Sequence, residues 1–149
     1  MKDFFEMRII GAVKELLEGR VNALFRESEF TIPVIEFGGY CGSSVVKPEI
    51  NLGFCERTEK ERIIQVDAYS LTLSFSLPEM PESELCCYAY AGAVGKAVFD
   101  NPTLGGVVDR AVVVGKKFIP PKKPHCGDGW EVVLTIRLTV EQRTFNKEQ

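Results

Sequence analysis

A long stretch of alternating residues near the middle of the chain constrains the fold most. The stretch covers residues 61–77, and from Tyr69 onward every second residue is apolar. The apolar residues are Tyr69, Leu71, Leu73, Phe75 and Leu77, and they alternate with the polar Ser70, Thr72 and Ser74. A period of two puts this set on one face of a β-strand. Strands usually run for about five or six residues, so one of this length is predicted to project beyond its own domain and to meet a partner there.

The first half of this strand has the opposite parity, because Ile64, Val66 and Ala68 fall on the other face. The switch predicts a bulge, a bend, or a strand end that is buried on both faces. A strand over residues 50–57 precedes it. The polar segment 58–60 predicts a short turn that joins the two strands in a hairpin.

The N-terminal segment, residues 3–18, predicts an amphipathic helix, because Phe5, Ile9 and Val13 recur at steps of four. Gly19 is predicted to end it. A short apolar group then continues the helix or forms a separate turn: Val21, Leu24 and Phe25. Residues 30–37 predict an extended segment that Pro33 confines to a sheet edge or an irregular stretch.

A second helix is predicted from Pro81 or Glu82 to Asp100 and is rich in alanine and glycine. Small side chains let a helix lie close to a sheet, although each glycine costs about 1 kcal/mol relative to alanine. Its predicted buried face consists of Leu85, Tyr88, Ala89, Val94 and Val98. Asn101 and Pro102 end the helix, because a residue before proline disfavours the helical conformation. Gly105 and Gly106 then let the backbone turn sharply into the next strand.

The last third predicts another hairpin, with strands at 107–119 and 130–142 joined by a loop at 120–129 rich in proline, lysine and glycine. The predicted order is therefore α-β-β-β-α-β-β without an internal repeat. The fold class that follows is α+β: a single domain with a mostly antiparallel sheet and two main helices packed on it. We expect the domain to cover residues 1–143, with a polar tail at 144–149.

The composition excludes several classes of protein. A net charge of −3 argues against a sequence-specific nucleic-acid-binding protein. No apolar run reaches the roughly 20 residues that a membrane span needs. The charged start lacks a signal-peptide pattern, and the five cysteines are an odd number at irregular spacing, which predicts reduced thiols and a cytoplasmic protein.

Few residues have the pattern of a catalytic or metal site. His125 is the single histidine, and its neighbour Cys126 shares a glycine- and proline-rich loop, which is a poor setting for a Cys–His pair. The cysteine spacings match no zinc motif. The glycine-rich segment 38–44 lacks the lysine of a phosphate-binding loop. We therefore predict no catalytic residue, cofactor or metal. The alternatives that stay open are a small-ligand-binding or enzymatic module using loops 38–44 and 120–129, and a dimeric adaptor.

Two oppositely charged segments are candidate contact surfaces. Residues 116–129 hold four lysines and one aspartate, and these lysines are Lys116, Lys117, Lys122 and Lys123. The helical segment 79–100 has an acidic excess from Glu79, Glu82, Glu84 and Asp100, with Lys96 as its one base. Such patches are expected to pair between copies in a head-to-tail ring or to contact a tail tube. Reversal of Lys122 and Lys123 to glutamate is then expected to break the oligomer.

The C-terminal two thirds resembles the tail terminator (tail completion) proteins of phages and prophages. The resemblance lies in a small-residue helix that leads into the connection NPTLGGVVD at 101–109, followed by a strand, a variable loop and the final strand WEVVLTIRLTV at 130–140. The N-terminal helix and the long central hairpin also fit that family.

This resemblance implies a structural subunit, not an enzyme, whose copies form a ring, commonly a hexamer. Such a ring stops growth of the tail tube and offers a surface to the head connector. The implied partners are other copies of the chain, the tail tube protein and the head–tail connector protein. The implied locations are the host cytoplasm during assembly and then the virion or prophage tail particle.

Overall fold

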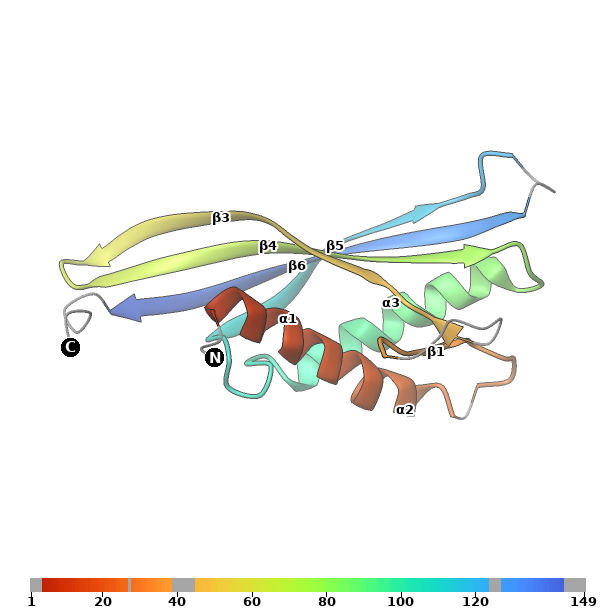
Figure 1. The fold of residues 1–149 in the computed structure, drawn as a ribbon, viewed down its shortest axis with the longest axis horizontal. Coiled ribbons are helices and arrows are strands. Elements are labelled where there is room, and N and C mark those ends of the chain that lie inside the picture. The colour runs from red at the N-terminus through yellow and green to blue at the C-terminus, as the bar shows by residue number, and fades with distance from the viewer. Residues whose placement is uncertain (1–3, 27, 39–44, 124–126, 144–149) are drawn as a thin grey trace.

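The computed structural model has two layers, a four-stranded sheet and a set of helices that covers one of its faces (Figure 1). It describes residues 4–26, 28–38, 45–123 and 127–143. All neighbouring strands of the sheet are antiparallel, in the order β3-β4-β6-β5. The strands are β3 (Glu49–Glu61), β4 (Ile64–Pro78), β5 (Arg110–Ile119) and β6 (Asp128–Arg143). The α+β prediction is confirmed.

The predicted order of elements is inexact in the N-terminal third. Of the extended segment 30–37, two residues form strand β1 (Val34–Ile35). This strand pairs in parallel with a further short strand, β2 (Val45–Val46), which the sequence did not predict. Both belong to a small separate sheet. The glycine-rich segment lies between them, and its residues 39–44 are outside the described part of the chain.

The first helix continues past its predicted end. α1 (Phe5–Leu16) runs into a π-helical turn, η1 (Leu17–Val21), and then into α2 (Asn22–Leu24). The prediction that Gly19 ends the helix is wrong, because the buried side chains of Leu17 and Val21 on either side of it hold the backbone against the core. Asn22 fastens the end of the helix to β1, since its amide exchanges two hydrogen bonds of 2.8 Å with the Ile35 backbone.

The second helix, α3 (Ser83–Asp100), ends where predicted but begins one or two residues later than predicted, and it has a different buried face. Leu85 and Tyr88 are 46% and 44% exposed, so their predicted burial is wrong, whereas Val94 and Val98 are buried as predicted. The centre of the buried face is Tyr90, whose ring stacks on Phe75 of β4 at 4.5 Å. Its hydroxyl donates to the Pro33 carbonyl oxygen at 2.7 Å, which joins α3 to the segment before β1.

The core lies between the helices and the face of the sheet that carries the alternating apolar residues. On β4 and β6 these residues stand opposite one another in the ladder, for example Leu71 with Ile136 and Phe75 with Val132. The long strand therefore buries the predicted apolar face. Ser70 and Thr72 lie on the other face, which the described helices leave uncovered (Figure 1).

In the first half of β4 the apolar residues change to the opposite face of the sheet, and a bulge in that strand is not the cause. The ladder between β4 and β6 is regular from Ile64 to Ser76, and the irregularities of the hairpin lie on β3 instead. This end of the sheet projects past α1 (Figure 1). At this end of β4, Asp67 therefore lies on the face that the helices cover farther along the strand. The apolar Ile64 and Val66 lie on the opposite face.

The hairpin turn is also later than predicted. It lies at residues 62–63, because β3 continues through 58–60 to Glu61. Asp67, 1% exposed, accepts two hydrogen bonds from the Arg57 guanidinium, at 2.6 and 2.8 Å, and this ion pair holds the register of the projecting end.

The Asp67 ion pair should make the fold sensitive to acid. Hydrogen bonds from Arg57 lower the pKa of the Asp67 carboxyl below its ordinary value. A lowered pKa in the folded state means that the contribution is complete above the unfolded value of about 3.9 and is lost as the pH falls through the folded value. Asp67→Asn should lower the free energy of unfolding by about 1–3 kcal/mol at neutral pH. The difference from wild type should shrink in strong acid.

Urea denaturation at neutral and acidic pH measures both effects. Glu59→Gln, which changes an exposed carboxylate on the same hairpin, is the matched control and should leave the stability nearly unchanged. An Asp67→Asn chain as stable as wild type at neutral pH would contradict this role.

Candidate functional site

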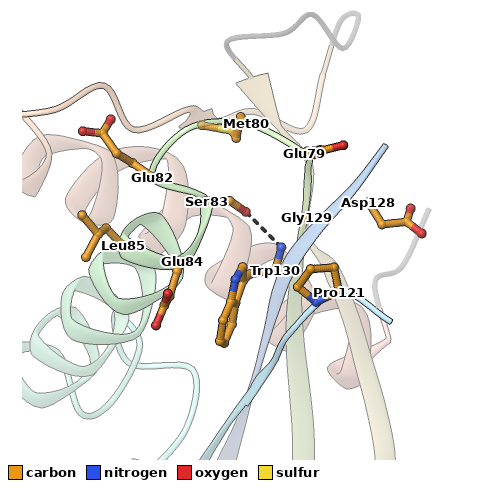
Figure 2. Close-up of a pocket in the computed structure, with 10 residues that line it drawn as sticks. All are labelled: Glu79, Met80, Glu82, Ser83, Glu84, Leu85, Pro121, Asp128, Gly129 and Trp130. Carbon is orange, nitrogen blue, oxygen red and sulfur yellow. Dashed lines mark hydrogen bonds between the residues drawn. The ribbon is translucent and has the colours of Figure 1, made fainter. Parts of the chain in front are cut away.

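An acidic cavity opens where β4 leads into α3 (Figure 2). Its volume is about 440 Å³. Residues from two distant parts of the chain line it, because the pairing of β4 with β6 brings the start of β6 beside the start of α3. The lining residues are Glu79, Met80, Glu82, Ser83, Glu84, Leu85, Pro121, Asp128, Gly129 and Trp130.

Hydrogen bonds from backbone N–H groups fix the shape of this cavity. The Trp130 N–H donates to Ser83 Oγ at 2.9 Å (Figure 2). The Glu79 N–H donates to the Gly127 carbonyl oxygen at 2.9 Å, and the Gly127 N–H donates to the Glu79 carboxylate at 3.2 Å. Only glycine fits at position 129, since a Cβ there would lie 2.6 Å from Ser83 Oγ and 2.7 Å from the Leu77 carbonyl oxygen, and closer still to that of Pro78.

The charge of the lining is negative. Glu79, Glu82, Glu84 and Asp128 supply four carboxylates, and the half-buried Trp130 supplies an aromatic ring. Glu84 lies beside this ring, whereas Glu82 points away from it (Figure 2). Carboxylates beside an indole ring suit a lysine or arginine side chain, through ion pairing and a cation–π contact.

The three candidate glutamates are thus brought together, and the lysine loop lies at the same end of the molecule. Lys122 lines a smaller cavity of about 220 Å³ that shares Asp128 and Trp130 with the acidic one. Lys123 follows it directly and is exposed. Complementary patches in a head-to-tail contact must lie on different sides of a subunit. The acidic residues and the lysine loop lie at the same end of the subunit, which favours a contact of both with another component at one end of a ring. The effect of reversing Lys122 and Lys123 stays a prediction.

Lys116 and Lys117 lie elsewhere, on β5. They pair with Leu134 and Val133 of β6, so their side chains point to opposite faces of the sheet. β5 is one edge of the sheet and β3 is the other. Counted over its bounds, β5 carries one arginine and two lysines without an acid, a charge of +3. β3 carries four glutamates, one arginine and one lysine, a charge of −2.

Each edge strand also exposes an apolar side chain on the uncovered face of the sheet. Phe54 of β3 is 65% exposed and Val114 of β5 is 58% exposed. Both border a shallow groove of about 230 Å³ whose floor includes Ser70, Thr135 and Arg137. The sheet therefore presents a polar, largely small-residue face between two apolar positions.

The turn after α3 has the backbone geometry that was predicted from its asparagine, proline and glycine residues. The Asn101 side-chain amide donates to the Ala97 carbonyl oxygen at 3.0 Å and so caps the helix. Gly105 and Gly106 have φ angles of 74° and 92°, in the left-handed region that favours glycine. The Pro102 carbonyl oxygen accepts the Ala111 N–H at 2.6 Å, which ties the turn to the start of β5.

The described thiols are not activated nucleophiles. Burial raises the pKa of the Cys86 thiol, and it raises the pKa of Cys87 to about 12. Cys55 is exposed, and partial desolvation together with the Asp67 charge raises its pKa as well. His125 and Cys126, like most of loop 38–44, lie outside the described residues. Within the described ranges, no three His, Cys, Asp or Glu side chains form a candidate metal site.

Trp130 and Asp128 were not predicted as site residues, because their approach to residues 79–84 depends on the register of β4 with β6. The glycine at position 129 is the one local signal for it. The opposite charges of the two edges could have been counted from the sequence, but only once β3 and β5 were known to be the edges.

No protein-family model matches the sequence, and no curated protein is significantly similar to it. None of the helices in the described part of the chain is both long and apolar enough to cross a membrane. The resemblance to tail terminators therefore depends on the 101–109 connection and on the order of the neighbouring elements.

Gly129→Ala should damage the acidic cavity and the fold together. Its Cβ would be forced against backbone oxygens, and overpacking of this kind costs about 1–3 kcal/mol. We expect a lower free energy of unfolding and a change in Trp130 fluorescence. In Gly19→Ala, the matched control, the new methyl group meets nothing within 4 Å, so stability should be unchanged or slightly higher. Equal stability of the two variants would contradict the close packing at Gly129.

Proposed function

We propose that this chain is a ring-forming structural subunit of a phage or prophage tail, a tail terminator that caps the tail tube and joins it to the head connector. The observation that carries the proposal is the pair of long, exposed and oppositely charged strands at the two edges of one sheet. The resemblance of the 101–109 connection to tail terminators supplies the identity of the ring.

The topology suits repetition of one contact around a ring. In the order β3-β4-β6-β5 every neighbouring pair is antiparallel, so β3 and β5 run in opposite directions. The β5 strand of one copy can therefore extend the sheet of the next copy by antiparallel pairing with its β3 strand. Such a contact is heterologous, and it forms a closed ring when the rotation between copies closes.

The charges support the same contact. An edge strand with unpaired N–H and C=O groups tends to pair with another chain, and charged side chains decide which pairings are tolerated. Opposite charges of −2 on β3 and +3 on β5 favour the β3–β5 contact and disfavour pairing of like edges. Salt should weaken the ring, because exposed charges are screened over about 10 Å at moderate ionic strength.

The ends of the ring are left for the other tail components. The projecting end of the sheet and the start of α3 lie at opposite ends of the subunit (Figure 1), so in this arrangement the projecting end and the acidic cavity would face opposite sides of the ring. We assign the tail-tube or connector contact at the second end to the glutamates of the cavity, Glu79, Glu82 and Glu84, together with Lys122 and Lys123.

A second candidate is a small-ligand-binding module, which the acidic cavity favours. Its four carboxylates and Trp130 would suit a small cationic ligand. The two functions differ in a simple measurement, because a ligand-binding module stays monomeric and changes its Trp130 fluorescence when a cation such as arginine or a polyamine is added.

Charge reversal on one edge tests the ring. Lys116→Glu with Lys117→Glu should convert rings to monomers, because both edges become acidic. Adding Glu56→Lys and Glu59→Lys to the same chain should restore rings, because the charges of the edges are then exchanged. Native mass spectrometry and negative-stain microscopy measure the assembly. Arg20→Glu with Arg26→Glu, a reversal of exposed charges on η1 and in the turn after α2, is the matched control and should leave the rings intact.

The tail role itself is tested with tail tubes assembled from the tube protein of the same phage or prophage. The wild-type chain should bind tube ends and stop their growth, and the Lys116/Lys117 double variant should not. Tubes that grow unchanged in the presence of the wild-type chain would show that the tail-terminator proposal is wrong.

A further inference from the structure

The outer face of α3 is a largely exposed apolar surface, although Tyr88 also contacts Phe118 of β5 and donates a hydrogen bond to Glu84. Leu85, Tyr88, Gly92, Gly95 and Phe99 follow one another at steps of three and four, so they form one stripe along the helix. Phe99 is 83% exposed, an unusual state for a phenylalanine next to other apolar surface. We call this surface the α3 stripe.

An apolar recess adjoins the C-terminal end of the α3 stripe. Its volume is about 430 Å³, and it lies between the end of α3 and the start of β5. The lining residues are Gly95, Val98, Phe99, Pro102, Arg110, Ala111, Val112 and Val113. A recess of this size accommodates one or two large apolar side chains.

α1 has an outer stripe with the same spacing. Phe4, Met7, Gly11 and Lys14 recur at steps of three and four along its exposed side, and Phe4 and Met7 are 68% and 49% exposed. We call this surface the α1 stripe. Each stripe thus combines large apolar side chains with glycine, and a Cβ added at Gly11, Gly92 or Gly95 would meet nothing within 4 Å in its own copy.

The two stripes flank the two edges of the sheet. α1 lies beside β3 and β4, because Phe5 contacts Tyr69 and Ile10 and Lys14 border a groove with the start of β3. α3 lies beside β5 and β6, and its Tyr88 contacts Phe118 of β5 at 5.1 Å. The helices run in opposite directions along the molecule (Figure 1). Pairing of β5 with β3 of the next copy therefore brings the α3 stripe beside that copy's α1 stripe.

We infer that the α3 stripe binds the α1 stripe of a second copy of this chain, as an antiparallel helix pair stacked on the β3–β5 contact. In the register that sets Gly11 against Gly92, Phe4 meets Phe99, and Met7 meets Gly95 and the recess. Lys14, whose ammonium lies over the Phe37 ring of its own copy at 5.3 Å, comes beside Tyr88. The glycines permit close approach of the two backbones. This inference rests on the ring in the proposed function and specifies its second layer of contact.

Two variants test the contact from its two sides. Gly92→Trp places a large side chain on the α3 stripe, at an exposed position where an added Cβ meets nothing within 4 Å in its own copy, and Met7→Asp places a charge on the α1 stripe. Each should fold as the wild type does, by circular dichroism and thermal unfolding, and each should be monomeric in native mass spectrometry. Phe99→Ser should weaken assembly about tenfold or more. Gly19→Trp, at an exposed helical glycine outside both stripes, is the control and should form rings.

A mixture distinguishes this contact from others. Gly92→Trp retains a normal α1 stripe and Met7→Asp retains a normal α3 stripe, so an equimolar mixture should form one intact contact and therefore a heterodimer, but no ring. Two monomers in the mixture, or binding of the α3 stripe to a tail tube or connector protein in place of a second copy, would overturn the inference.

The outcomes also separate this inference from the proposed function. Rings that survive Gly92→Trp and Met7→Asp but are lost in the Lys116/Lys117 reversal would overturn the helix contact and leave the tail terminator standing. A heterodimer in the mixture together with unchanged growth of tail tubes would support the helix contact and overturn the tail role. A wild-type chain that caps tubes but is monomeric at every concentration would overturn the helix contact.

Discussion

The antiparallel ladder between β4 and β6 is the interaction on which the rest of the structure depends. It joins the middle of the chain to its C-terminal end over the whole length of β4, and its regular register places Phe75 opposite Val132 and Leu71 opposite Ile136. The resulting apolar surface is the floor on which Tyr90 stacks. The same register carries Gly129 and Trp130 to the start of α3, so the acidic cavity is a consequence of strand pairing.

Both main helices lie on one face of this sheet, so the other face is not covered by the described part of the chain. The uncovered face, the edges β3 and β5, and the projecting end of the hairpin are all accessible in one copy. Exposed edges are a risk for uncontrolled association. In the proposed ring, charges of opposite sign on the two edges would favour one pairing, and a single heterologous pairing repeated in a closed ring would pair every edge.

The strands could be predicted from the sequence because a period of two is a local property. The alternation in β4 and β6 and the polar connections between strands are sufficient to predict a mostly antiparallel sheet. Gly19 was wrongly predicted to end a helix because the burial of Leu17 and Val21, a tertiary effect, outweighs the local preference of glycine. The acidic cavity could not be predicted from the sequence. It brings residues 79–85 together with residues 128–130 through the register of β4 with β6, and no local pattern specifies that register.

The buried face of α3 was predicted incorrectly for a reason that bears on function. The helix is apolar on nearly all sides, so its sequence does not say which side meets the sheet. Tyr90 and the thiols Cys86 and Cys87 took the buried positions, and this rotation leaves Leu85, Tyr88 and Phe99 outside. A surface helix normally has one polar face. An apolar outer face on α3 is expected if that face is also buried in the functional state, and in the proposed ring a second copy of the chain buries it.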